Sequence, residues 1–125
     1  MSTLPSSSLA RYAGWLGIAV GVGLFGHGIH TFTFDAPPPL PYRIAVLIAG
    51  ALEVVLAWMT LRANRVGWSF FVSLNGTLFV VGLFGGPRVR DAFEIDLAFA
   101  LLPCFLFATA CTLAVVAHED FGAGD

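Results

Sequence analysis

The sequence predicts an all-α membrane protein, a bundle of four transmembrane helices with both ends of the chain on the same side of the bilayer. Three observations predict this fold class: an apolar composition, apolar segments of membrane-spanning length, and turn-forming residues between them. Of the 125 residues, 58% are hydrophobic and 11% are charged, whereas about 25% of an average soluble domain is charged. This composition excludes a cytosolic enzyme and a nucleic-acid-binding domain with a basic patch.

The apolar segments each approach the ~20 residues that a helix needs to cross about 30 Å of hydrocarbon. They cover approximately residues 12–32, 42–61, 66–85 and 97–117. Each segment is apolar on nearly all sides, whereas helices of soluble bundles carry a polar face. Because these segments occupy most of the chain, we expect a single transmembrane domain over residues 1–125.

The connections between the segments contain residues that end helices. Residues 35–41 hold four prolines and form the connector that we call the proline loop, which should be stiff and extended. Residues 62–65 are short and basic, as a tight helical hairpin requires. Residues 85–91 open with Gly-Gly-Pro, which should end the third helix at Gly85, and Pro103 should kink the fourth helix.

The arginines give an expectation for orientation. Arg62 and Arg65 lie in the shortest connection, which contains no acid, and short cytoplasmic loops are enriched in Arg. Four spans put both termini on the side of this connection. We therefore expect a multi-pass protein of a bacterial or archaeal cell membrane, embedded in lipid, with cytoplasmic termini.

The first segment is rich in glycine and contains a Gly-x-x-x-Gly pattern at Gly17 and Gly21. Small residues allow transmembrane helices to approach closely and gain van der Waals contact. We expect this face to pack within the chain. The alternative is a dimerisation face that would produce a homo-oligomer.

Glu53 is the one acid in the middle of an apolar segment. An ionisable group at mid-bilayer costs about 2.5–3.5 kcal/mol on insertion scales and marks a functional site by default. Small residues such as Gly50 and Ala57 share its helical face, so the side chain should point into the bundle. A buried carboxyl is then either protonated and donating a hydrogen bond, or paired.

Two further polar residues have depths that suggest contact with Glu53. Asn75 is level with Glu53 at mid-span, and His27 should lie within roughly 7 Å of that depth. We predict a buried polar cluster of His27, Glu53 and Asn75, with His30 and Arg43 at its mouth. The alternative is a set of interhelical hydrogen bonds that serve packing alone, worth about 0.6 kcal/mol each.

Haem and metal sites are not expected. A haem with two histidine ligands needs them at one level on different helices, and His118 lies at the interface opposite to His27 and His30. His27, His30 and Glu53 are too loosely spaced to indicate a metal site.

The segment from Leu47 to Ala57, with Gly50 followed by Glu53 and an Arg-bearing turn, resembles the second span of the DoxX-like family. These are small four-helix membrane proteins with a proline-containing first loop. The resemblance implies a small membrane subunit of an oxidoreductase complex, with quinone as a possible cofactor and oxidoreductase subunits as partners. It carries over Glu53 alone, because His27 and His30 replace the basic residue often found at the end of the family's first span.

Two other classes of function remain open. Small proton-coupled transporters also have four spans and a membrane-embedded glutamate, but their glutamate is on the first helix. A non-catalytic assembly subunit of a larger membrane complex is the third class.

Overall fold

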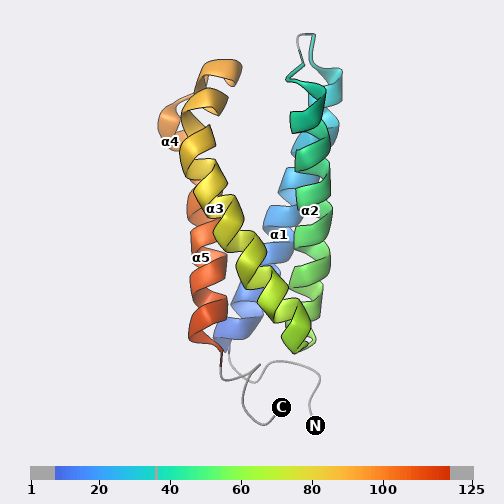
Figure 1. Cartoon of the computed structure of the whole chain (residues 1–125), viewed down its shortest axis with the longest axis vertical. Helices are drawn as coiled ribbons and strands as arrows, with labels where there is room; N and C mark the ends of the chain where they lie inside the picture. The colour runs from blue at the N-terminus through green and yellow to red at the C-terminus, as the bar shows by residue number, and fades with distance from the viewer. Residues whose placement is uncertain (1–7, 36, 119–125) are drawn as a thin grey trace.

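The computed structural model describes residues 8–35 and 37–118, and within them every regular element is a helix (Figure 1). The elements are α1 (Ser8–His30), η1 (Thr31–Thr33, a 3₁₀ turn), α2 (Leu40–Leu61), α3 (Arg65–Phe93), α4 (Leu97–Ala100) and α5 (Leu102–Val116).

Four helical segments are long and apolar enough to cross a membrane, as the sequence predicts. They are Ser8–Thr33, Leu40–Leu61, Arg65–Asp91 and Leu97–Val116. The first two begin earlier than the sequence pattern indicated, because polar and proline residues form their first turns. The described residues are thus all-helical and have the spans of a multi-pass membrane protein, and the orientation in the bilayer stays a prediction.

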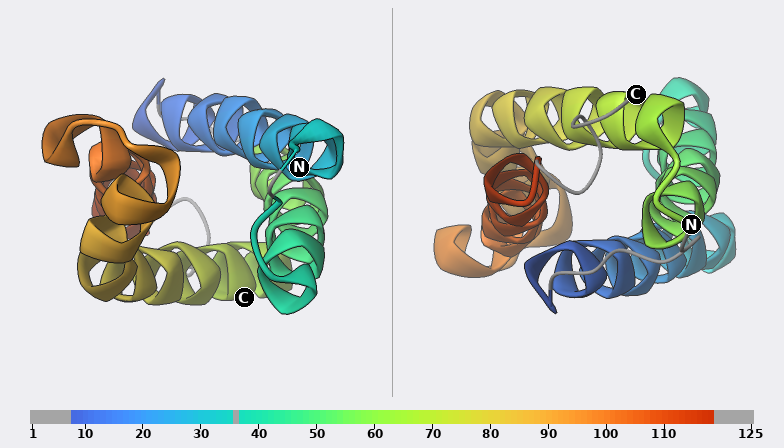
Figure 2. Two further views of the ribbon diagram at one scale, coloured as in Figure 1. Left: turned by 90° about the horizontal axis from the view of Figure 1, so that it is seen from above. Right: turned by 90° about the horizontal axis from the view of Figure 1, so that it is seen from below.

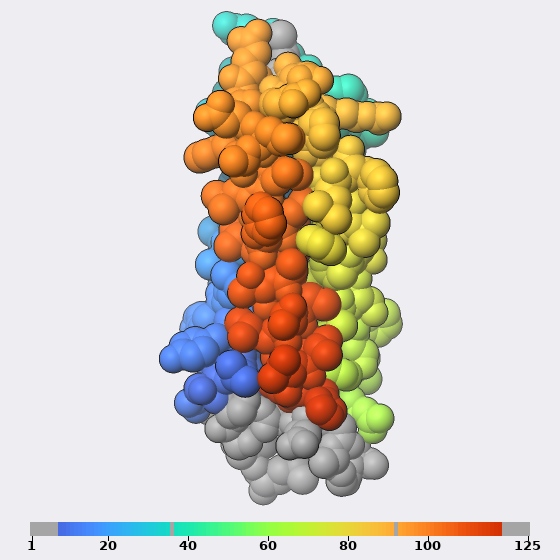
Figure 3. Space-filling view, turned by 90° about the vertical axis from the view of Figure 1, so that its left-hand side faces the viewer, coloured from blue at the N-terminus to red at the C-terminus, as the bar shows by residue number. Residues whose placement is uncertain are grey.

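The four long helices form the sides of a ring in the order α1, α2, α3 and α5 (Figure 2). The side of the molecule shown in Figure 3 presents α5 between α1 and α3. The start of α1 and the end of α5 lie at the same end of the bundle, where Ala10 packs against Ala117. An even number of spans explains this arrangement.

Helix α3 is longer than the sequence pattern predicts. It was expected to stop at Gly85, but it continues through Pro87 to Phe93 and has 29 residues. Glu94 then ends it in a left-handed conformation with φ 54°. Proline removes one helical hydrogen bond, yet transmembrane helices tolerate it because lipid offers the backbone no alternative partner.

The fourth span is divided rather than simply kinked. Leu101 separates α4 from α5, and Pro103 lies in the first turn of α5. Proline is favoured there because the first N–H groups of a helix have no partner within it. The kink predicted at Pro103 is thus replaced by a break at Leu101.

Glycines of α1 bring its backbone close to α2, which confirms the predicted packing within the chain. A Cβ atom at Gly14 would meet Leu61, one at Gly21 would meet Gly50 and Val54, and one at Gly28 would meet Leu47. These contacts also fix the register between the two antiparallel helices.

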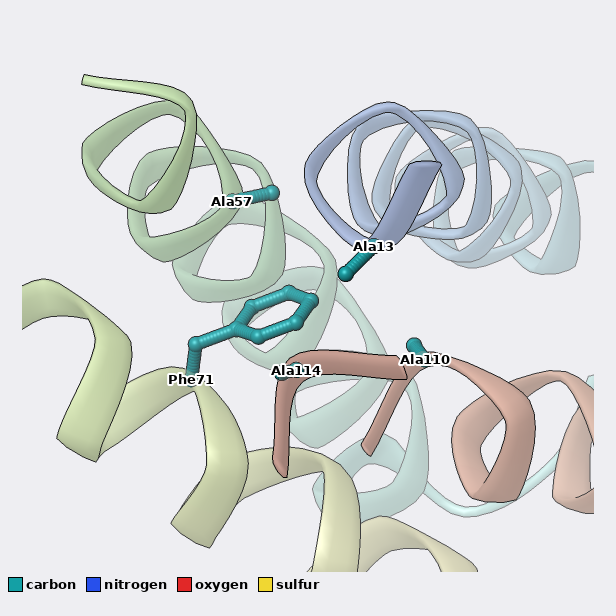
Figure 4. Close-up of a cluster of buried hydrophobic side chains, with 5 residues drawn as sticks. All are labelled: Ala13, Ala57, Phe71, Ala110 and Ala114. Atoms are coloured by element: carbon teal, nitrogen blue, oxygen red, sulfur yellow. The ribbon is translucent and has the colours of Figure 1, made fainter. Parts of the chain in front are cut away.

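The apolar core lies toward the end of the bundle that holds the short connection between α2 and α3. It consists of Ala13, Ala57, Phe71, Ala110 and Ala114, with the ring of Phe71 between alanines of the other three helices (Figure 4). Above this core, toward the proline loop, the pair α1 and α2 diverges from α3 and α5 (Figure 1).

Candidate functional site

Glu53 of α2 and Asn75 of α3 form a hydrogen-bonded pair inside the bundle. Both side chains have 0% exposure. Asn75 Nδ2 donates to Glu53 Oε1 over 2.7 Å and also to the main-chain oxygen of Phe71 over 2.8 Å. The structure therefore brings these two predicted cluster residues together and turns both away from lipid.

The antiparallel hairpin of α2 and α3 places the pair at one level. Glu53 precedes the end of α2 at Leu61 by about 12 Å of helical rise, and Asn75 follows the start of α3 at Arg65 by about 15 Å. Phe71 is one turn before Asn75 on the same face of α3, so its ring places the apolar core directly next to the pair.

Two polar atoms of the pair have no partner among the described residues. They are Glu53 Oε2 and Asn75 Oδ1, and both are buried. An unsatisfied buried polar group costs about 1–3 kcal/mol. Unsatisfied buried polar groups are rare in proteins, so the two atoms make the pair a candidate site.

His27 takes part in a different group, near the proline loop. Its Nε2 atom lies 3.1 Å from the hydroxyl oxygen of Tyr42. The Phe93 ring packs edge-on at 5.6 Å from the His27 ring and at 5.7 Å from the Phe34 ring. We call His27, Phe34, Tyr42 and Phe93 the aromatic group.

His27 lies near its predicted depth but turns to a different partner. Gly21 is beside Val54, and Gly28 is beside Leu47, so Glu53 is level with the part of α1 between these two glycines, close to Gly21. His27 is therefore about 8 Å further along the helix axis, close to the roughly 7 Å expected from the sequence. Its Nε2 atom is within hydrogen-bonding distance of Tyr42.

His30 and Arg43 lie at the proline-loop end, where the mouth of the cluster was expected, but they turn to other partners. The His30 ring packs edge-on against Phe34, with ring centres 4.9 Å apart. Arg43 Nε donates to the main-chain oxygen of Pro38 over 2.9 Å, and its guanidinium lies 4.7 Å from the ring centre of Phe32. Arg43 thus braces the proline loop.

The sequence analysis missed Tyr42 and Phe93 as members of a site. The signal for Tyr42 was its position in the first turn of the second helix, opposite the end of the first. Phe93 could be found only by extending the third helix past Pro87.

The described residues, 8–35 and 37–118, contain no group of three His, Cys, Asp or Glu side chains that could hold a metal ion. Comparison of the chain with protein-family models, with curated proteins and with solved structures finds no match. The fold and the buried pair define a four-helix, multi-pass membrane protein with one acid–amide site in its interior.

Replacing Phe93 with alanine should loosen the end of α3. The ring contacts three side chains of α1, α2 and the proline-loop region, so its loss should cost about 1–2 kcal/mol, less than for a fully buried ring. Hydrogen–deuterium exchange should rise for residues 88–93. Phe84→Ala is the control, because that ring is 80% exposed, and equal exchange in both variants would contradict the role of Phe93.

Proposed function

We propose that the protein is the small membrane subunit of a quinone-linked oxidoreductase complex, as its resemblance to DoxX-like proteins implies. The observation that carries the proposal is the buried Glu53–Asn75 pair. An acid at 0% exposure in the middle of an apolar helix raises the free energy of the folded protein in the membrane. Such residues commonly mark proton relays and substrate sites.

The chemistry of quinones gives this pair a use. Reduction of a quinone to a quinol takes up electrons and protons in equal number, within a lipid phase that holds no bulk water. A carboxyl such as Glu53 can hold and release a proton at that depth. In this proposal a redox partner subunit supplies the electrons, and Glu53 supplies a proton.

The aromatic group provides features that suit a quinone head group. Tyr42 and His27 share one hydrogen bond, and when His27 Nε2–H is the donor in it, the Tyr42 hydroxyl is free to donate to a carbonyl oxygen. The rings of Phe34 and Phe93 offer flat apolar surface beside them. The group lies at the ends of α1, α2 and α3, nearer to the membrane surface than Glu53.

Tyr42→Phe should weaken quinone binding by about fivefold. The change removes one hydroxyl and one hydrogen bond, worth about 1 kcal/mol, and keeps the ring. The measurement is isothermal titration calorimetry, in which a short-chain ubiquinone analogue is added to the full chain in lipid nanodiscs.

Tyr12→Phe is the matched control, because Tyr12 is the other tyrosine of the chain and its side chain is 62% exposed on α1. It should bind the quinone analogue like the original protein. Absence of saturable binding, or equal weakening in both variants, would remove the quinone from the proposal and favour an assembly subunit.

A proton-coupled transporter is the second candidate. It is favoured by the full burial of Glu53, because ionisable side chains inside a membrane bundle commonly mark ion and proton pathways.

Proteoliposomes distinguish the two candidates. A transporter would release protons in exchange for a hydrophobic cation such as ethidium, reported by a pH-sensitive dye, and Glu53→Gln would abolish the exchange. Quinone binding without such exchange supports the oxidoreductase subunit.

A further inference from the structure

The hydrogen-bonding capacity of the Glu53–Asn75 pair can be counted atom by atom. The amide nitrogen of Asn75 has one hydrogen for Glu53 Oε1 and one for the oxygen of Phe71. Both of its donors are used, which fixes the orientation of the amide. The remaining atoms, Glu53 Oε2 and Asn75 Oδ1, are buried and unpartnered. With an ionised carboxylate both are acceptors, so the pair lacks a donor.

A single proton supplies what is missing. On Glu53 Oε2 it makes an O–H donor, and Asn75 Oδ1 is the free acceptor of the same pair. The carboxyl and the amide are planar groups already joined by one hydrogen bond, so a second bond closes a reciprocal acid–amide pair. One added atom thus satisfies both open positions.

The surroundings disfavour an ionised carboxylate. Among the described residues the one ion pair joins Arg90 and Asp91 on the surface, so no cation offsets a charge on Glu53. A buried carboxylate without a partner charge is far more costly than a neutral, hydrogen-bonded acid.

A metal ion fits the pair less well than a proton. Hard cations such as Mg²⁺ and Ca²⁺ take about six or more oxygen ligands, whereas the pair offers two unpartnered oxygens. The main-chain oxygen of Phe71 already accepts from Asn75.

We propose that Glu53 and Asn75 hold one exchangeable proton, carried on Glu53 Oε2 and donated to Asn75 Oδ1. The pair is then neutral and fully hydrogen-bonded. This inference deepens the proposed function and rests on the same site, since it names the proton as what the site holds, but its test needs no quinone.

Infrared spectroscopy of the full chain in lipid nanodiscs at neutral pH tests the proposal. The C=O stretch of a protonated carboxyl should be present and should move to lower frequency in D₂O. Glu53→Gln should lose the band. Asn75→Leu should keep it but move it to higher frequency, because the hydrogen bonds to the acid are gone.

Glu94→Gln is the matched control, since that glutamate is exposed at the end of α3, and it should retain the band unchanged. Glu53→Gln should fold normally, because the side-chain N–H of glutamine can replace the O–H donor to Asn75. Its melting temperature should equal that of the original protein.

Two results would overturn the inference. One is a spectrum in which the original protein and Glu53→Gln are identical in the carboxyl region. The other is a melting temperature that rises with sodium chloride but not with choline chloride, and only when Glu53 is present, which would assign a metal cation to the site. If the carboxyl C=O band of Glu53 is present but the protein binds no quinone analogue, the inference stands and the proposed function is removed.

Discussion

Asn75→Leu is expected to lower the free energy of unfolding by about 2 kcal/mol, because it removes the donor to Glu53 Oε1 and the acceptor proposed for the Glu53 O–H group. The double variant Glu53→Leu with Asn75→Leu should recover to within about 1 kcal/mol of the original protein, since apolar replacement of both members of a buried polar pair is often neutral. The measurement is unfolding in mixed detergent micelles by added SDS, followed by circular dichroism.

The double variant also separates packing from function. If it is stable but binds no quinone analogue and moves no protons, the pair has a role beyond holding α2 to α3. If it is stable and fully active, the pair serves packing alone. If Asn75→Leu alone is as stable as the original protein, the hydrogen bond between Asn75 and Glu53 contributes little to stability in the membrane.

Gly50→Ala should destabilise the protein by about 2–3 kcal/mol through overpacking. Its Cβ atom would lie 2.6 Å from the backbone nitrogen of Phe25 and 2.9 Å from the oxygen of Gly21. These are main-chain atoms that cannot rotate aside, so α1 and α2 must separate. A fall in the melting temperature in detergent, measured by circular dichroism, checks this.

Gly26→Ala is the control for Gly50→Ala, because a Cβ atom there would meet no atom within 4 Å. Alanine is favoured over glycine in helices by about 1 kcal/mol, so this variant should melt at the same or a slightly higher temperature. Equal melting of the two variants would contradict the close contact between α1 and α2.

The sequence was sufficient to predict the spans and the Glu53–Asn75 pair. The number of spans follows from the number of apolar segments that are long enough to cross a membrane. The inward direction of the Glu53 side chain follows from the small residues on its face of the helix. Asn75 could be placed level with Glu53 because the connection of residues 62–64 is too short to allow a large offset between α2 and α3.

The remainder of the site depends on where helices end, and composition determines this poorly in a membrane. Gly-Gly-Pro ends helices in water, where freed backbone groups find new partners, but α3 continues through it because lipid provides none. This extension brings Phe93 to His27. His27 likewise pairs with Tyr42, in the first turn of α2, a contact that depends on where α2 begins.

The continuation of α3 through Pro87 has a mechanical consequence. Without an N–H at Pro87, the oxygen of Leu83 loses its usual helical donor, and a Cβ atom at Gly85 would meet nothing within 4 Å. Bending is therefore easier here than elsewhere in α3. Pro87 lies close to the end of α3, so bending at this point would move Phe93 relative to His27 and Tyr42 while the part of α3 that holds Asn75 stays in place.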